Sequence, residues 1–326
     1  MNKPRVAFLG TGWIGRHRME AMLATGVVEA VAIGDPSAET AAQAHALAPD
    51  ATLVASLDDM LALKPDGVVI ATPSALHTAQ SIRALEAGAA VFCQKPLGRS
   101  ADEAAAVVAA ARGADRLLSV DFSYRFTAGM ARIAELVRGR ALGHIHAVDL
   151  VFHNAYGPDK PWFYDRAQSG GGCVMDLGVH LVDLALWTLG FPEVVDVTSN
   201  LFAGGQPLAG DQVEDFALAT ITLANGTAIR LTCSWRASVG RDAEISASFF
   251  GDAGGAALRN VDGSFYDFRA EHHRGTGSEV LVSPPDDWGG RAAIDWARRL
   301  AAGERFDAGC EHLVTVARVL DRIYAS

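Results

Sequence analysis

The N-terminal part of the chain alternates short apolar runs with alanine-rich stretches of helical periodicity. The runs predict buried strands, and the stretches predict helices that open at capping residues such as Ser56 and Ser100. Strands are expected at 5–9, 30–34, 67–71, 90–93 and 117–120, and helices at 14–25, 36–49, just after 56, 77–87 and 101–112. This rhythm implies a parallel sheet with helical crossovers that ends near Asp121.

The remaining sequence has a different pattern. The expected elements are a helix at 130–138, a strand at 144–152, a glycine-rich loop at 169–172, a helix at 174–189, strands at 194–201, 215–223, 227–235, 243–250 and 264–268, and helices at 288–302 and 311–324. Asn225-Gly226 is a strong hairpin turn between two of these strands. Strands in series without helices predict an antiparallel or mixed sheet. We therefore expect an α/β domain at 1–121 and an α+β domain with an open, mainly antiparallel sheet at 122–326.

The first predicted strand runs into Gly10-x-Gly12-x-x-Gly15 and then directly into a helix. Gly10 permits a tight turn, Gly12 lets the backbone approach a pyrophosphate, and Gly15 lets the helix pack close to the strand. The free N–H groups and the positive dipole end of that helix then face the phosphates. The strand–turn–helix context predicts a doubly wound Rossmann domain that binds a dinucleotide.

An acid at the end of the second predicted strand bears on the choice of cofactor. Asp35 lies 20 positions after Gly15, where a carboxylate can accept both ribose hydroxyls of the adenosine half and repel a 2′-phosphate. This position favours NAD over NADP. Two other interpretations stay open: Asp35 opens the turn before Pro36 or caps the next helix, and Arg16 and Ser37 help to bind a phosphate.

Composition narrows the partners. The formal net charge of −10 argues against nucleic acid, since phosphate binding needs a basic surface. Apolar runs stay well short of the ~20 residues of a membrane span, and the N-terminus has no apolar core of a signal peptide. The four cysteines are scattered and form no C-x-x-C pair, so buried thiols in a reducing cytoplasm are expected, without a metal site or a disulfide framework. We expect a cytoplasmic protein without a membrane partner.

Two segments carry candidate chemistry. Lys95 follows the predicted strand 90–93, at the edge of a parallel sheet where ligands bind. Asp176 and His180 are four apart, so they share one face of a helix, and Asp183 continues that side. A histidine there can take a proton from a hydroxyl. A metal site would lack an obvious third ligand, and the structural alternative is a capping aspartate with a hydrogen-bonded core histidine.

In combination, these motifs resemble the glucose–fructose oxidoreductase, inositol dehydrogenase and rhizopine catabolism (Gfo/Idh/MocA) family. The matching elements, in order, are the glycine motif, Asp35, Thr72-Pro73-Ser74 with His77, Gly88-x-x-Val91-x-x-x-Lys95-Pro96-Leu97, Tyr124-x-Phe126 and Gly170-Gly-Gly-x-x-x-Asp176-x-Gly178-x-His180-x-x-Asp183. The resemblance covers essentially the whole chain. The family usually has Glu-Lys-Pro where this chain has Gln94-Lys95-Pro96, so one local negative charge is lost.

The resemblance implies an oxidoreductase that moves a hydride between nicotinamide and a secondary hydroxyl or ketone of a sugar, inositol or related polyol. Lys95 would hydrogen-bond the reacting oxygen beside the nicotinamide, Asp176 would bind a substrate hydroxyl, and His180 would be the general base. The implied cofactor residues are Gly10, Gly12, Trp13, Ile14, Gly15, Asp35, Thr72, Pro73, His77, Gln94 and Lys95. The substrate residues are Lys95, Tyr124, Asn154, Tyr156, Trp162, Asp176 and His180.

Two other functions stay open at this point. One is a hydrolase or lyase that keeps NAD tightly bound and oxidises its substrate transiently. The other is a dinucleotide-sensing regulator without catalysis, which the retained Lys95 and His180 disfavour. The sequence does not select a substrate or a direction of reaction. An exposed sheet face favours a homodimer or homotetramer.

Overall fold

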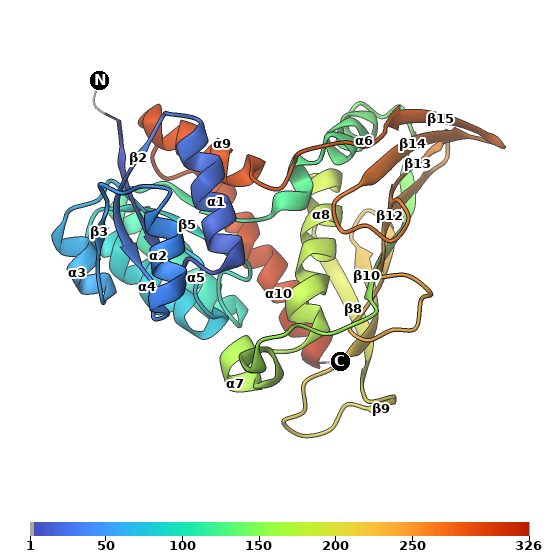
Figure 1. Cartoon of the computed structure of the whole chain (residues 1–326). Coiled ribbons are helices and arrows are strands. Elements are labelled where there is room, and N and C mark those ends of the chain that lie inside the picture. The colour runs from blue at the N-terminus through green and yellow to red at the C-terminus, as the bar shows by residue number, and fades with distance from the viewer. Residues whose placement is uncertain (1–2, 326) are drawn as a thin grey trace. The chain divides into compact units, whose positions relative to one another are not determined.

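The computed structural model describes residues 3–325 and divides the chain into two compact units. The first unit comprises the chain up to Asp121 together with Gly290–Thr315, and the second comprises Phe122–Gly289 with the residues from Val316 onward. The segment Gly290–Thr315 thus belongs with the N-terminal residues, although the sequence analysis places it in the C-terminal domain. Figure 1 shows the first unit mainly in blue and cyan, with this later segment in red.

The first unit contains a parallel sheet of six strands in the order β3-β2-β1-β4-β5-β6. This order is that of doubly wound dinucleotide-binding folds. The strands are β1 (Arg5–Leu9), β2 (Glu29–Gly34), β3 (Thr52–Leu53), β4 (Gly67–Ile70), β5 (Ala90–Cys93) and β6 (Leu118–Val120). β1, β4 and β5 are buried almost throughout, as expected for apolar strands covered on both faces.

Helices connect these strands where the sequence predicts them. They are α1 (Trp13–Ala24), α2 (Ala38–His45), α3 (Leu57–Ala62), α4 (Ser74–Glu86) and α5 (Ala101–Ala114). A further helix of this unit, α9 (Arg291–Ala301), comes after the strands of the second unit in the chain. Ser56 and Ser100 cap α3 and α5, because their hydroxyls accept the N–H groups of Asp59 and Glu103 at 3.1 and 3.2 Å. α9 packs against α1 and β5, and it buries Trp296 completely.

The second unit contains a nine-stranded sheet in the order β15-β14-β13-β12-β7-β11-β10-β8-β9. All pairings are antiparallel except that of β7 with β11. The strands are β7 (Ile145–Asn154), β8 (Val194–Ala203), β9 (Gln206–Pro207), β10 (Phe216–Leu223), β11 (Ala228–Ser234), β12 (Ala243–Gly251), β13 (Gly255–Asn260), β14 (Phe268–Arg274) and β15 (Gly277–Val282). The Asn225-Gly226 turn joins β10 to β11 in an antiparallel hairpin, which confirms that prediction.

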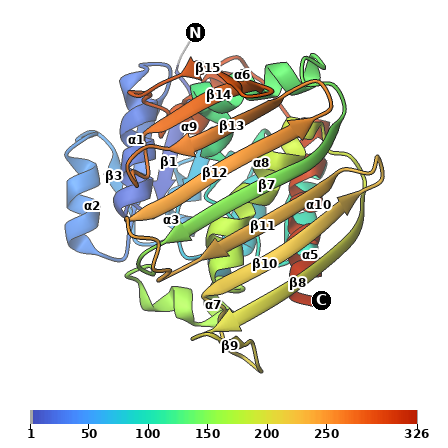
Figure 2. The same cartoon turned by 90° about the vertical axis from the view of Figure 1, so that its right-hand side faces the viewer.

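Helices pack on one face of this sheet only. They are α6 (Ala128–Arg138), which packs on β13 and β14, and α8 (Val179–Leu189), which packs on β7 and β11; the short α7 (Arg166–Ser169) precedes α8, and α10 (Glu311–Ala325) ends the chain. Figure 2 shows the opposite face, which no helix of the unit covers. Side chains alternate between the two faces, so Leu231 is buried while its neighbour Arg230 is exposed.

The structure departs from the sequence prediction at several elements. Of the residues predicted as a strand at 264–268, residues 264–267 form a loop, because β14, which pairs with β13, starts only at Phe268. β13 and β15 were not predicted, since their short, glycine- and alanine-containing sequences carry little alternation. The predicted helix 174–189 begins with a π-helical turn at Val174–Gly178.

Residues 166–189 form the one helical stretch in residues 3–325 that is long and apolar enough to cross a membrane. In the structure, 83% of its most apolar window is buried inside the protein, as in a core helix.

Candidate functional site

The glycine loop between β1 and α1 has the geometry that a bound phosphate requires. Gly10 has φ +81°, and a Cβ there would lie 2.6 Å from the carbonyl oxygen of Ala71. A Cβ at Gly15 would lie 2.1 Å from the carbonyl oxygen of Gly10, so the helix approaches the strand too closely for a side chain. At Gly12, by contrast, a Cβ would meet no atom within 4 Å. The loop therefore has no room for a side chain at Gly10 or Gly15, whereas Gly12 borders open space.

The N-terminus of α1 is free to bind an anion. Its N-cap, Gly12, has no side chain to accept the first N–H groups, and the first turn contains no acidic residue. Trp13 in that turn is 58% exposed. Open space over Gly12 and uncapped N–H groups on a 12-residue helix fit the pyrophosphate of a dinucleotide.

Asp35 lies beside this loop, at the end of β2. Its Oδ2 accepts the N–H of Thr11 at 2.7 Å, and its Oδ1 accepts the N–H of Ser37 at 2.9 Å. The contact with Ser37 stabilises the turn after β2, which is the structural role that the sequence left open for Asp35. The first contact joins the carboxylate to the glycine loop. Arg16 hydrogen-bonds to Gln43 on α2.

His77 links the ends of β4 and β5. Its ring is 1% exposed, with Nδ1 at 2.6 Å from the carbonyl oxygen of Pro96 and Nε2 at 2.7 Å from that of Thr72. Burial lowers the pKa of His77, the two backbone contacts oppose this, and the charge of Lys95 lowers it further. His77 therefore ties the loop of Thr72 to the cis Lys95–Pro96 peptide and lies near the Lys95 side chain. Lys95 itself is half-buried.

Gln94 belongs to a buried polar cluster that the sequence analysis did not foresee. Its Nε2 donates to Oδ2 of Asp121 at 2.6 Å, and Nε of Arg18 on α1 donates to the same oxygen at 2.6 Å. Asp121 is 2% exposed, and its Oδ1 has no hydrogen-bond partner within residues 3–325. A glutamate at position 94 would place a second carboxylate against Asp121. In this chain, the carboxylate beside position 94 is that of Asp121, which follows β6.

In the second unit, Glu214 holds the glycine-rich loop that leads to Asp176. Its carboxylate accepts the N–H groups of Gly172 and Val174 at 2.9 Å and the hydroxyl of Tyr324 at 2.7 Å. Its carbonyl lies so close that a Cβ at Gly172 would be 1.9 Å from it. A carboxylate at the first N–H groups of this helix also complements the helix dipole. The loop has no room for a side chain because Glu214 and Tyr324 fill the space.

Asp176 sits in the π-helical turn, a feature often found at functional sites. The indole N–H of Trp235, at the end of β11, donates to its Oδ2 at 3.1 Å. His180 contacts Tyr124, with ring centroids 5.0 Å apart. Burial raises the pKa of Tyr124, and the charges of Asp176 and Tyr266 raise it further. Asp176, His180, Tyr124 and Tyr266 therefore form one neighbourhood.

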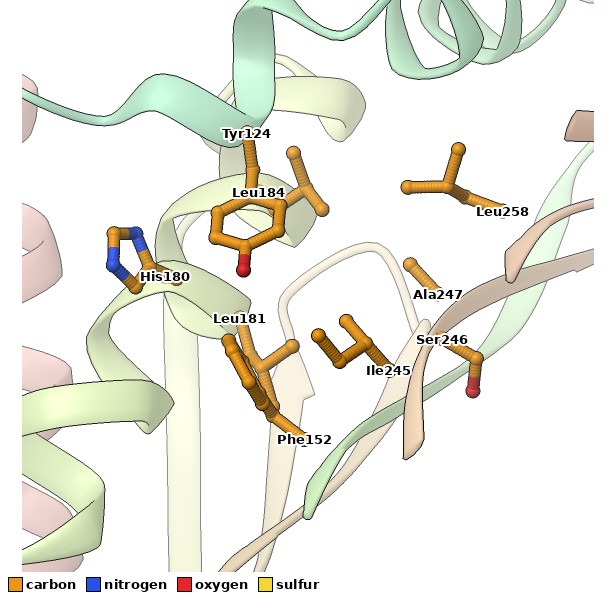
Figure 3. A pocket seen from close by; sticks show the side chains of 9 residues that line it. All are labelled: Tyr124, Phe152, His180, Leu181, Leu184, Ile245, Ser246, Ala247 and Leu258. Atoms are coloured by element: carbon orange, nitrogen blue, oxygen red, sulfur yellow. The ribbon is translucent and has the colours of Figure 1, made fainter. Parts of the chain in front are cut away.

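Figure 3 shows the ring of Tyr124 between the imidazole of His180 and apolar side chains of α8 and the sheet. These side chains surround a cavity of about 10 Å³, which has room for a water molecule at most. Its lining includes Phe152, Leu181, Leu184 and Ile245. The apolar side chains around this cavity surround the Tyr124 ring, and the cavity is too small to hold a substrate.

The predicted wall residues of the substrate site have different surroundings. Trp162 stacks on Phe163 at 3.8 Å, and Phe163 meets Trp235 at 6.2 Å, which connects this pair to Asp176. Asn154 ends β7, and its Oδ1 is buried without a partner in the described part of the chain.

Tyr156 is 53% exposed and lies against Phe265, in the loop after β13. No local pattern in the sequence points to Trp235, Tyr266 or Trp288, whose ring lies 4.9 Å from that of Tyr124, because each of them follows a strand end or lies in a loop.

Asp183 belongs to the fold of the second unit. It is buried and forms a bidentate ion pair with Arg125, whose Nε lies 2.7 Å from Oδ2. Burial raises the pKa of Asp183, and Arg125 opposes that shift. The guanidinium also lies over the rings of Phe122 and Trp187. This ion pair joins the 3₁₀ turn that carries Tyr124, at Ser123–Phe126, to α8.

Models of known protein families match both parts of the chain. Residues 4–122 match the model described as an oxidoreductase family with an NAD-binding Rossmann fold. Residues 130–257 match the model described as the GFO/IDH/MocA C-terminal domain.

Individual proteins resemble the chain over most of its length. D-glucoside 3-dehydrogenase of Escherichia coli K12 is 31% identical, covering 78% of this chain and 76% of that protein. Inositol 2-dehydrogenase of Rhodococcus erythropolis is 28% identical, covering 93% and 80%. Levoglucosan dehydrogenase, solved with NADH and levoglucosan, has the same fold with a TM-score of 0.86 at 22% identity, covering 100% of this chain and 97% of that one.

Proposed function

Because the chain belongs to the Gfo/Idh/MocA family of oxidoreductases, we propose that it oxidises a secondary hydroxyl of a sugar or polyol, or reduces the corresponding ketone, with NAD. The observation that carries this proposal is the neighbourhood of Asp176, His180 and Tyr124 in a chain whose other unit has an open dinucleotide loop. The relatives named above support a sugar or inositol as the substrate class.

Each side chain has a definite role in this proposal. NAD, when bound, supplies the hydride acceptor or donor. Lys95 carries a positive charge that stabilises negative charge on the reacting oxygen, an effect that can contribute several kcal/mol in a site shielded from water. Asp176, oriented by the Trp235 indole, accepts a hydrogen bond from a substrate hydroxyl. His180 takes the hydroxyl proton during oxidation and returns it during reduction.

The cofactor preference follows from Asp35. Its carboxylate lies beside the glycine loop, where a 2′-phosphate would meet a negative charge, so we assign NAD rather than NADP. Cofactor residues of the first unit are the glycine loop, Trp13, Ile14, Thr72, Pro73, His77, Gln94 and Lys95 in this assignment. We further assign the protein to the cytoplasm, with small molecules and not nucleic acids or membranes as its partners.

The uncovered face of the second unit's sheet is assigned to a second copy of the chain. Leu218, Phe250 and Val280 are 41–52% exposed, and the strand register places them on the same face as the ion pair of Arg230 with Asp149. A homodimer or homotetramer would bury these apolar side chains. Light scattering of the purified protein tests this, and a monomer at micromolar concentration contradicts it.

The deciding experiment for the reaction is nicotinamide absorbance with NAD or NADP across inositols, aldoses, glycosides and polyols. One substrate class should give a signal with NAD. Lys95→Ala and His180→Ala should each lower kcat at least ~10³-fold. In His180→Ala the NAD affinity should change less than ~3-fold, because His180 lies in the second unit. Full turnover in either variant contradicts the roles assigned here, and tight NAD binding without any signal points to a hydrolase, a lyase or a sensor.

A further inference from the structure

A recess beside the candidate substrate site has no role in the reaction proposed above. It lies in the second unit, has a volume of about 670 Å³, and is formed mainly by the loop between β13 and β14. Its lining includes Asp242, Asp262, Phe265, Tyr266, Asp267 and Pro284. This volume falls within the range of small-molecule sites and exceeds that of the cavity behind Tyr124.

The chemistry of the lining favours a ligand with hydroxyl groups and without negative charge. Asp242 and Asp262 are exposed, and their carboxylates make no hydrogen bond or ion pair within residues 3–325. Ionised carboxylates only accept hydrogen bonds, so they suit hydroxyl donors and repel phosphate. Phe265 and Tyr266 add aromatic surface against which the C–H face of a sugar ring can pack.

The loop that forms the recess is held in one conformation. Nδ2 of Asn260 donates to the carbonyl oxygens of Ala243 and Ser264, each at 2.9 Å, and its Oδ1 accepts the N–H of Ile245 at 2.9 Å. The hydroxyl of Ser264 accepts the N–H groups of Tyr266 and Asp267, each at 3.1 Å. A preformed recess loses less entropy when a ligand binds.

Tyr266 connects the recess to the residues around His180. The indole N–H of Trp288 donates to the carbonyl oxygen of Tyr266 at 2.8 Å. The Trp288 ring in turn lies 4.9 Å from the ring of Tyr124, which contacts His180. Phe265 contacts Tyr156, a predicted substrate residue. Two neighbouring sugar rings could therefore contact the two regions at once.

We propose that this recess binds the second, uncharged sugar ring of a glycoside whose first ring reacts at Asp176 and His180. The proposal rests on the proposed function and names its substrate class as neutral glycosides and disaccharides. The carboxylates also select against substrates that carry a phosphate in place of the second ring, such as sugar phosphates and nucleotide-linked sugars. Specificity thus comes from the loop after β13, outside the reacting residues.

Turnover measurements on a matched panel test this inference. The panel contains glucose, the methyl α- and β-glucosides, maltose, cellobiose and glucose 1-phosphate, each with NAD. We expect a disaccharide to exceed glucose in kcat/KM by about tenfold or more, which corresponds to ~1.4 kcal/mol, and glucose 1-phosphate to be the poorest. Tyr266→Ala should reduce the disaccharide-to-glucose ratio of kcat/KM about tenfold.

Charge is tested separately. The double variant Asp242→Asn/Asp262→Asn should raise kcat/KM for glucose 1-phosphate relative to glucose about fivefold, because two repulsive charges are gone. Asp50→Asn/Asp211→Asn, which removes two exposed acids outside the recess, is the matched control and should leave that ratio unchanged. An equal change in the control would mean that net charge, and not the recess, sets the preference.

Binding measurements separate this inference from the proposed function. Tryptophan fluorescence is titrated with each sugar on wild type and Tyr266→Ala, whether or not any sugar is oxidised. Tighter binding of a disaccharide than of glucose, lost in Tyr266→Ala, supports the recess even if no turnover occurs. Equal binding of glucose and the disaccharides, or tenfold preference for a cationic amino sugar, overturns it even if glucose is oxidised.

Discussion

In the first unit, backbone atoms shape the dinucleotide loop, whereas in the second unit side chains from distant segments hold Asp176. Gly10 and Gly15 contact carbonyl groups of their own turn and of Ala71. Asp176 depends on Trp235, and the loop before it depends on Glu214 and Tyr324. The loop therefore has no room for added atoms at Gly10 and Gly15, while the Asp176 segment loses support when one of these hydrogen-bonding side chains is removed.

The variant with the largest expected effect weakens cofactor binding at the backbone loop without destabilising the fold. Gly12→Ala adds a methyl group into space that no protein atom fills, so the free energy of unfolding should change by less than ~1 kcal/mol. NAD affinity should fall about a hundredfold or more, equivalent to ~2.8 kcal/mol, because the methyl group occupies the place of the pyrophosphate. Titration calorimetry and thermal unfolding measure the two quantities.

Gly15→Ala is the matched variant for that prediction. Its methyl group would lie 2.1 Å from the carbonyl oxygen of Gly10, so the folded state should be destabilised as well. Unchanged NAD affinity in Gly12→Ala would mean that the open side of the loop does not face the pyrophosphate.

The second prediction removes a side chain that holds the Asp176 segment. Glu214→Gln replaces an oxygen that accepts hydrogen bonds by an N–H₂ group, and we expect a loss of about 2 kcal/mol in the free energy of unfolding. Tyr324→Phe removes one of the same hydrogen bonds and should cost about 1 kcal/mol. Urea unfolding measures both losses. Equal stability of wild type and Glu214→Gln would show that the carboxylate does not hold the loop.

The difference in stability between wild type and Glu214→Gln should depend on pH. Burial raises the pKa of Glu214 above its ordinary value of 4.5, against the opposing hydrogen bonds from Val174 and Tyr324. The folded protein therefore binds this proton more tightly than the unfolded chain does, and the stability contributed by Glu214 falls as pH rises from 4.5 through the raised value. The advantage of wild type over Glu214→Gln should be largest near pH 4.5 and should shrink as pH increases.

The third prediction concerns the amide beside Lys95. Gln94→Glu places two carboxylates together at Asp121, and we expect a loss of about 1.5 kcal/mol in unfolding free energy at pH 8 that shrinks near pH 5, where one carboxylate can bind a proton. The exchange Gln94→Glu/Asp121→Asn pairs a carboxylate with an amide again and should recover most of this loss. If the double variant is less stable than either single variant, the two positions do not act as a pair.

The smallest expected effect concerns cofactor choice. Asp35→Asn keeps an acceptor for the Thr11 N–H but removes the negative charge. The ratio of NADP to NAD affinity should rise about fivefold, close to 1 kcal/mol, while Asp35→Ala should also weaken binding of both by loosening the loop. A constant ratio in both variants would remove Asp35 from cofactor selection.

Much of the first unit could be predicted from sequence because its signals are local. The glycine motif, the capping serines Ser56 and Ser100 and the apolar strands all depend on neighbours in the chain. The second unit was predicted less completely. β13 and β15 lack clear alternation, and the loop before Phe268 contains enough aromatic residues to resemble a strand.

The candidate site shows the same division. The spacing of Asp176 and His180 was visible in the sequence, and so was Lys95 after its strand. The π-helical turn at Asp176 was not, and neither was the hydrogen bond from Val174, at its start, to Glu214, forty positions further along the chain. The sequence also identified Gln94 as unusual but gave no reason for it, and the Asp121 carboxylate that explains it lies at the end of a different strand.

By itself, the sequence determined the family, the alternating order of strands and helices in the first unit and the glycine loop, and it singled out Lys95, Asp176 and His180 as candidates for the chemistry. These features depend on residue type and short-range spacing, which the chain records directly. Only the tertiary structure decided how Asp176 is held, why position 94 is an amide and where an acidic, aromatic recess lies beside Tyr124. Those features depend on side chains that hydrogen-bond or pack only after strands far apart in the chain have paired.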